Sequence, residues 1–186
     1  MFLDEKGEKI SKSVGNGISV DQWLRYGSPE SLSLYMFQKP KSAKKLFFDV
    51  IPKTVDEYIA HYNNYEKLDK IKKIDSPIWH IHAGNPKGFK SDITFNALTN
   101  LVSICNTDDK DIIWGFVNQY DSNLNPSVNP EFDKLIDYAI NYYTDFVLPN
   151  KKYLVVNNDN KIVLEDMLNI LKTQITEKDS AEEIQT

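Results

Sequence analysis

The amino-acid sequence predicts a mainly α-helical protein: a short N-terminal hairpin with a loop, then connecting helices, then a partial α-helical bundle. Three observations support this fold class. Apolar residues recur at helical spacing through most of the 186 residues, helix start signals precede several of these segments, and short polar connections favour antiparallel neighbours. With 41% hydrophobic and 12% aromatic residues, the chain is long enough to bury one core or two small ones.

The first ten residues are expected to form the hairpin. The apolar pair Phe2 and Leu3 is followed by a polar turn that ends near Gly7, and Lys9 and Ile10 come next. Gly7 stands where the turn requires a positive φ angle. Because a two-stranded hairpin is only marginally stable alone, we expect it to lean on a further sheet.

Two short helices are expected after the loop. Ser19, three residues before a glutamine, is a capping-box pattern that opens a helix ending at Gly27. Ser28, which is followed by Pro29, is expected to begin a second helix, and this helix is expected to end at Pro40. These two helices would fasten the far end of the loop to a hydrophobic layer.

The rest of the chain reads as longer helices. Apolar spacing predicts one amphipathic helix from about residue 52 to 67, and Asp75-Ser76-Pro77 then breaks the chain at a candidate domain boundary. Most aromatic residues beyond this point, including Trp114, are expected in the core. The capping-box pattern at residues 180–183 predicts the start of one more helix, only three residues before Thr186. We therefore expect the bundle to continue beyond Thr186. Further helices are predicted at 93–105, which is nearly all apolar and central, and at 112–120, 129–146 and 162–175.

Composition and charge limit the class of protein. The net charge is −5, but residues 1–90 hold 15 Lys and Arg against 11 Asp and Glu, whereas residues 91–186 hold 7 against 16. The net negative charge argues against a generic nucleic-acid binder, and any contact with nucleic-acid phosphate is expected in the basic first half. The single cysteine, Cys105, leaves no intrachain disulfide and fits a reducing compartment. No signal-peptide pattern and no membrane-length apolar run is present, so we expect a cytoplasmic protein without a membrane partner.

Two lysine clusters stand out in the basic half. The denser one contains Lys39, Lys41, Lys44 and Lys45, and the other lies at residues 67–73. Each cluster can be a solvated surface that keeps the protein soluble, or a surface that contacts the backbone of RNA. The spacing of the lysines leaves both interpretations open.

The segment Trp79-His80-Ile81-His82 is the most conspicuous sequence outside the loop. Two histidines at i and i+2 could bind a metal with further ligands, but no set of cysteine, histidine or acidic residues at a familiar spacing accompanies them. We therefore expect no metal site. We expect both imidazoles to be hydrogen-bonded beside buried Trp79 and Ile81, with RNA contact as the alternative.

The loop Lys9-Ile10-Ser11-Lys12-Ser13 carries the strongest chemical signal. Two lysines three positions apart are each followed within two residues by a serine, and Gly15 and Gly17 come next as candidate hinges. Ammonium groups are compact charges suited to an anion, and hydroxyl groups can add hydrogen bonds to phosphate oxygens. The loop is therefore expected to bind a polyphosphate.

This pentamer resembles the KMSKS signature of class I aminoacyl-tRNA synthetases, with Ile10 in place of the methionine. The sequence that follows is similar to class I lysyl-tRNA synthetases of the alphaproteobacterial-like branch, and the similarity covers nearly all 186 residues. The stretches that carry it are residues 15–19, 23–24, 28–32, 38–41, 48–52, 55–58, 79–86 and 113–116.

The resemblance implies a role for each loop residue. Lys9 and Lys12 would be the catalytic pair, stabilising the pyrophosphate that leaves when the carboxylate of lysine attacks the α-phosphate of ATP. Ser11 and Ser13 would help to bind the phosphates, and Mg²⁺ would arrive with ATP as substrate. The residues implied in contacts with tRNA(Lys) are Lys39, Lys41, Lys44 and Lys45.

The resemblance also implies three parts. Residues 1–27 would end a Rossmann catalytic domain, residues 28–75 would form a helical connecting region, and residues 76–186 would begin an α-helical anticodon-binding domain of the helix-cage type. The family's His-Ile-Gly-His-type motif and amino-acid pocket would precede this chain. We therefore expect the rest of the Rossmann domain and the C-terminal half of the anticodon-binding domain as partners, and no activity from the 186 residues alone.

Two other interpretations stay open. Glutamyl- and glutaminyl-type class I synthetases share the loop and a helical or mixed domain behind it, so only the longer downstream similarity favours lysine. Alternatively, the chain is a non-catalytic helical module that binds RNA or another protein. Assaying the chain for adenylate formation distinguishes an enzyme from a module.

Overall fold

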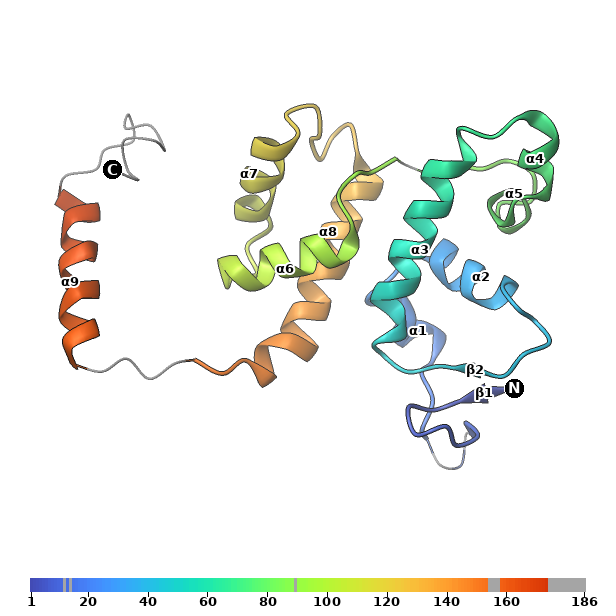
Figure 1. Ribbon diagram of the computed structural model, residues 1–186, viewed down its shortest axis with the longest axis horizontal. Coiled ribbons are helices and arrows are strands. Elements are labelled where there is room, and N and C mark those ends of the chain that lie inside the picture. Colours follow the sequence, from blue (N-terminus) through green and yellow to red (C-terminus); the bar gives the residue numbers. More distant parts are fainter. Residues whose placement is uncertain (12, 14, 89, 154–157, 174–186) are drawn as a thin grey trace. The chain divides into compact units, whose positions relative to one another are not determined.

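The computed structural model describes residues 1–186 except 12, 14, 89, 154–157 and 174–186. The chain divides into two compact units, Met1–Asn150 and Lys151–Thr186. Among the described residues, the only sheet is a pair of two-residue strands, and helices supply nearly all other regular structure. The predicted mainly α-helical fold is confirmed (Figure 1).

The N-terminal hairpin forms, but its strand has a second partner. Strand β1 (Phe2–Leu3) turns back through Gly7, which has a φ of 88°, and Leu3 makes an antiparallel bridge to Lys9. Strand β2 (Lys44–Lys45) then pairs with β1 in parallel, with Phe2 opposite Lys44. This pairing was not predicted, because two lysines in a basic cluster show no strand alternation.

The two short helices after the loop begin where their caps were predicted. Helix α1 (Val20–Leu24) has a complete capping box at Ser19, and helix α2 (Pro29–Phe37) has Ser28 as N-cap. The indole Nε1 of Trp23 in α1 donates to the hydroxyl of Ser31 in α2 at 3.1 Å, and both side chains are buried. The hydrophobic layer that was expected behind the loop is therefore present.

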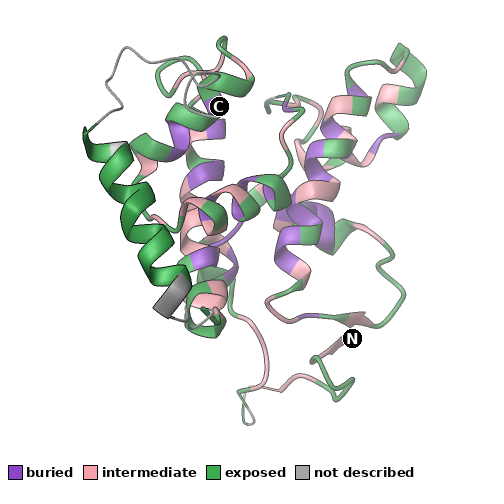
Figure 2. Ribbon diagram, turned by 60° about the vertical axis from the view of Figure 1, so that its left-hand side comes forward, coloured by how far each residue is buried: buried purple, intermediate pink, exposed green. Residues whose placement is uncertain are grey.

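Helix α3 (Val50–Tyr65) is the central element of the first unit. It confirms the amphipathic helix that was predicted at about 52–67, and it packs against α2, α5 and α6. Figure 2 shows its buried residues in purple along one side, from the end near the strands to the far end. The buried residues of α3 are Ile51, Pro52, Thr54, Val55, Tyr58, Ile59, Tyr62 and Tyr65.

Ser76 separates two short helices. It ends α4 (Lys70–Asp75), and its hydroxyl accepts a hydrogen bond from the amide of Ile78 in α5 (Pro77–Ile81). Ile78 is fully buried, whereas Trp79 and Ile81 are only half-buried. The expectation that Trp79 and Ile81 are the buried residues was therefore wrong, because a one-turn helix directs only one of these positions at α2 and α3.

Three helices form the bundle of the first unit: α6 (Phe95–Cys105), α7 (Lys110–Tyr120) and α8 (Pro130–Tyr142). Helix α8 continues into a π-helical turn, η1 (Tyr143–Val147), and a 3₁₀ turn, η2 (Leu148–Asn150). Trp114 is buried, as predicted, against Phe132 with ring centroids 5.5 Å apart. The helix predicted at 93–105 is less enclosed than expected, since Ile104 is 82% exposed.

The second unit contains helix α9 (Asn158–Thr173), which confirms the helix predicted from residue 162. The capping-box pattern at residues 180–183 lies outside the described residues. Within the described part of the chain, no helix combines the length and the apolar character that crossing a membrane requires.

Candidate phosphate-binding site

The loop from Lys9 to Gly17 is shaped by one side chain, that of Asn16. Its carbonyl oxygen accepts a hydrogen bond from the amide of Ser11 at 3.1 Å, and its Nδ2 donates to Asp4 Oδ2 at 2.8 Å. The same Nδ2 reaches the carbonyl oxygen of Lys9 at 3.5 Å. Asn16 therefore ties the beginning of the loop to its end and to the hairpin below it.

The two loop glycines have different roles. Gly15 has a φ of 67°, which favours glycine, and its amide donates to the carbonyl oxygen of Ser11 at 3.1 Å. Gly17 has no positive φ; a Cβ added there would lie 2.5 Å from Cγ2 of Ile10. Gly17 is thus needed for the close approach of Ile10, and the expectation that it is a hinge of positive φ was wrong.

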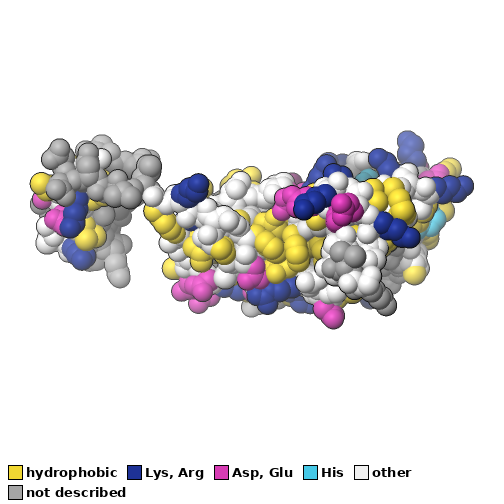
Figure 3. Space-filling model, turned by 90° about the horizontal axis from the view of Figure 1, so that it is seen from below, with side chains coloured by type: hydrophobic (Ala, Val, Ile, Leu, Met, Phe, Trp, Pro, Cys, Tyr) yellow, Lys and Arg dark blue, Asp and Glu magenta, His cyan; other side chains and the backbone are white. Residues whose placement is uncertain are grey.

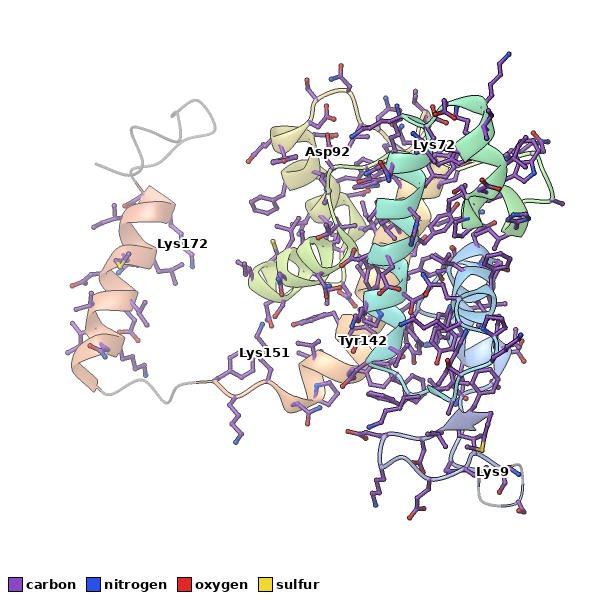
Figure 4. The ribbon with its side chains drawn as sticks, turned by 45° about the vertical axis from the view of Figure 1, so that its right-hand side comes forward. Lys9, Lys72, Asp92, Tyr142, Lys151 and Lys172 are labelled. Atoms are coloured by element: carbon purple, nitrogen blue, oxygen red, sulfur yellow. The ribbon has the colours of Figure 1, made fainter. Side chains whose placement is uncertain are left out.

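The structure places the predicted phosphate ligands as follows. The side chain of Lys9 is exposed, at the end of the first unit that lies opposite Lys72 (Figure 4). The hydroxyls of Ser11 and Ser13 are hydrogen-bonded to each other at 3.2 Å, so they lie close enough for both to contact one anion that replaces this bond. Lys12 lies outside the described residues.

A hollow of about 480 Å³ lies between the loop, the hairpin and the chain after β2. Asp4, Glu5 and Glu8 line it, with Lys6 as its cation. Hydrogen bonds, first that of Asn16 and then that of the Glu8 amide, lower the pKa of Asp4, so this carboxylate is charged at neutral pH. Because three carboxylates repel a polyphosphate, this hollow is unsuited to one, and the Lys9 and Ser11 part of the loop is the better anion surface.

Two of the four lysines that the sequence implied in RNA contacts also bond within the protein. The ammonium group of Lys44 donates to the carbonyl oxygens of Tyr35 and Met36 at the end of α2. Burial, and then the charge of Lys39, lower the pKa of Lys44. Lys45 donates to the carbonyl oxygen of Glu5 at 3.1 Å.

A basic groove of about 270 Å³ is lined by three of these four lysines and by one further lysine, Lys53. Lys39, Lys44 and Lys45 line it together with Lys53, and Glu57 is its one carboxylate. Lys41 is exposed but does not line the groove. Lys53 was missed in the sequence because it stands alone in the first turn of α3, eight residues after Lys45.

A polar junction connects the end of α1 with the helical bundle. Arg25 Nε donates to Asp145 Oδ2 at 2.7 Å, and the hydroxyl of Tyr26 donates to the same oxygen at 2.8 Å. These hydrogen bonds, that of Arg25 first, lower the pKa of Asp145. The amide Nδ2 of Asn141 also donates to the carbonyl oxygen of Arg25 at 3.1 Å. Sequence reasoning missed this junction, since its partners are more than 100 residues apart and no local pattern marks them.

His80 and His82 contact different side chains. His82 Nε2 is 3.1 Å from the hydroxyl of Tyr58, and burial lowers the pKa of His82. His80 instead stacks on Phe37 at the surface. Among the described residues, no group of three or more His, Cys, Asp or Glu is arranged to hold a metal ion.

Comparison with known proteins gives one consistent result. Residues 1–85 match the model of the family described as tRNA synthetases class I (K). Over its whole length the chain is 48% identical to a lysine–tRNA ligase of Rickettsia peacockii (strain Rustic). It is 49% identical to one of Rickettsia bellii (strain OSU 85-389) and 48% identical to one of Rickettsia felis.

The chain spans 35% to 36% of the length of these relatives. No solved structure matches it significantly. The similarity therefore concerns one segment of the relatives, about a third of their length.

Proposed function

We propose that this chain is part of an ATP-dependent lysine–tRNA ligase of the class I lysyl-tRNA synthetase family. In this reaction lysine is first activated to lysyl-adenylate and then transferred to tRNA(Lys). The proposal is carried by one observation: a loop with an exposed lysine and two converging serine hydroxyls, within a chain that is similar to lysine–tRNA ligases along its whole length.

Lys9 and Lys12 are the catalytic residues of this proposal. When the carboxylate of lysine attacks the α-phosphorus of ATP, a new bond forms between them, the bond from the α-phosphorus to the α,β-bridging oxygen breaks, and negative charge grows on the departing pyrophosphate. Cations that contact pyrophosphate more strongly in the transition state than in bound ATP lower the barrier. An exposed lysine on a loop whose described hydrogen bonds are few can make such a contact at the moment of reaction.

Ser11 and Ser13 have a supporting role. Their hydroxyls lie within 3.2 Å of each other and can donate to neighbouring phosphate oxygens. Ile10 stands where the family signature has methionine, and its contact with the backbone at Gly17 holds the loop in place without polar atoms. Mg²⁺ would enter with ATP as part of the substrate.

The remainder of the chain would serve tRNA binding in the cytoplasm. We propose that residues 1–27 end the catalytic domain, that residues 28–75 form the connecting region, and that residues 76–186 begin the anticodon-binding domain. Lys39, Lys41, Lys44 and Lys45 would contact the tRNA backbone. The basic groove supports this for Lys39, Lys44 and Lys45, because all three line it and can act on phosphates that enter it.

The reaction is tested with the complete ligase that contains this segment. ATP–pyrophosphate exchange is measured with lysine, glutamate and glutamine as the amino acid. The proposal predicts exchange with lysine only. Exchange that occurs with glutamate or glutamine but not with lysine would reassign the chain to another class I synthetase.

The tRNA contacts are tested by replacing Lys41, Lys44 and Lys45 together by alanine in the complete ligase. The logarithm of the tRNA association constant falls linearly with the logarithm of salt concentration, with a slope set by the number of phosphates neutralised. The triple variant should show a flatter slope. A slope equal to that of the wild type would remove these lysines from the RNA surface.

A further inference from the structure

The inference begins with a pair of stacked rings at the protein surface. Phe37 is the last residue of α2 and His80 lies on α5; their ring centroids are 5.4 Å apart and their planes differ by 16°. Phe37 is 45% exposed, and His80 is exposed as well. A single exposed apolar side chain needs no explanation, but two exposed rings that stack from different helices present a flat aromatic surface.

Both rings stand on fixed backbone. The end of α2 is held by Lys44, whose ammonium donates to the carbonyl oxygens of Tyr35 and, at 3.2 Å, of Met36. Helix α5 is held by Ile78, which is fully buried, two residues before His80. A ligand that stacks on this pair therefore needs to order little of the protein, which favours binding.

Residues of the basic groove follow Phe37 directly along the chain, because Gln38 and Lys39 both line it. Lys39 follows Phe37 by two residues, is exposed, and has a φ of 45°, a backbone conformation that is uncommon for residues other than glycine. Lys39 also lines the basic groove of about 270 Å³, with Lys44, Lys45 and Lys53. Figure 3 shows Lys and Arg side chains gathered toward the end of the molecule that carries α2, α4 and α5.

A flat aromatic surface next to a basic groove matches the requirements of an unpaired nucleotide. The base needs a ring to stack on, and its neighbouring phosphates need cations a few ångströms further along the backbone. An apolar protein segment would instead need a wider apolar surface without lysines around it. The charge next to the ring pair therefore favours RNA over a protein partner.

We propose that Phe37 and His80 stack an unpaired base of the bound tRNA while the adjoining phosphates lie in the groove of Lys39, Lys44, Lys45 and Lys53. This inference rests on the proposed function, since it names where on the chain the tRNA is held. It adds two residues, Phe37 and His80, and one cation, Lys53, to the lysines that the sequence indicated.

The test uses the complete ligase and measures its dissociation constant for tRNA(Lys). Phe37→Leu removes the ring but keeps an apolar side chain, and Phe37→Tyr keeps the ring. Val20→Ala is the control, because Val20 is 59% exposed but lies on α1 and does not line the basic groove. Stacking is expected to make Phe37→Leu bind roughly 5- to 150-fold more weakly, whereas Phe37→Tyr and Val20→Ala should bind like the wild type.

Salt dependence separates stacking from charge. Phe37→Leu removes no charge, so the slope of log K against log salt should stay that of the wild type, while Lys53→Ala should reduce its magnitude by about one. Wild-type affinity in Phe37→Leu, or a loss in Phe37→Tyr as large as that in Phe37→Leu, would overturn the inference. A wild-type ligase that fails to bind tRNA(Lys) would overturn the proposed function itself, which is a different result.

Discussion

The loop at residues 9–17 and the layer formed by α2 and α3 are stabilised by different forces. The loop is exposed or half-buried at its described positions, and its shape depends on a few hydrogen bonds centred on Asn16. The layer depends on burial: Leu34 of α2 and Ile51 of α3 are fully enclosed. A region held by few contacts can rearrange while the rest of the protein remains folded. The comparison therefore predicts that stability and catalysis can be changed separately.

The largest effect on stability should come from the layer. Leu34→Ala removes a fully buried side chain and leaves a cavity, so it should lower the free energy of unfolding by about 2–5 kcal/mol. Met36→Ala on the same helix is the control, because Met36 is 42% exposed and should cost far less. Urea denaturation measures both, and equal losses in the two variants would contradict the assignment of the core.

Asp56 should have the next largest effect, because it caps a helix other than its own. Its carboxylate accepts hydrogen bonds from the amides of Phe95 and Asn96 at the start of α6, at 2.5 and 3.3 Å. Asp56→Ala should lower the free energy of unfolding by about 1–2 kcal/mol. Asp56→Asn keeps one acceptor oxygen and should lose less. An Asp56→Ala variant as stable as the wild type in urea would show that α6 does not need this cap.

The junction of Arg25, Tyr26 and Asp145 should contribute less, because it is partly exposed. Asp145→Asn should lower the free energy of unfolding by about 1 kcal/mol at pH 7. Folding lowers the pKa of Asp145, so its contribution is fully present above the unfolded value of about 3.9 and is lost as the pH falls through the lower native value. The difference between the variant and the wild type should therefore shrink below about pH 4. A difference that persists at pH 2 would contradict the role of the charge.

The smallest effect on stability should come from the loop. Asn16→Ala removes the side-chain hydrogen bonds that tie the loop to Asp4 and Ser11, yet the site is only half-buried, so the free energy of unfolding should change by less than about 1 kcal/mol. In the complete ligase the same substitution should nevertheless slow ATP–pyrophosphate exchange. Asp21→Ala, which alters an exposed residue of α1, is the control for both measurements. Unchanged exchange in Asn16→Ala would show that the shape of the loop does not matter for the reaction.

Local signals in the sequence were sufficient to predict much of this fold. The caps at Ser19 and Ser28 lie within three residues of the groups they bond, so spacing alone reveals them. The residue types of the loop likewise led to the prediction of an anion site, which rests on no knowledge of the geometry of the loop. The burial of Trp114 followed from its place in an apolar repeat.

Contacts between distant residues could not be predicted in this way. The pairing of β1 with β2 joins residues about 40 positions apart. In the sequence, the two lysines of β2 look the same whether they form a strand or belong to a surface cluster. The carboxylates of Asp56 and Asp145 act on helix ends far away in the chain, and neither stands at a position that marks a cap or a turn. Such contacts depend on tertiary packing, which a single sequence does not display.

The central claim is that the two loop lysines act on the departing pyrophosphate. The most direct measurement compares ATP–pyrophosphate exchange and lysine binding in the complete ligase carrying Lys12→Ala, alone and together with Lys9→Ala. A transition-state role predicts that exchange falls by roughly 100-fold or more while the dissociation constant for lysine stays nearly unchanged. Exchange and lysine binding that weaken by the same factor, or exchange that survives the loss of both lysines, would contradict it.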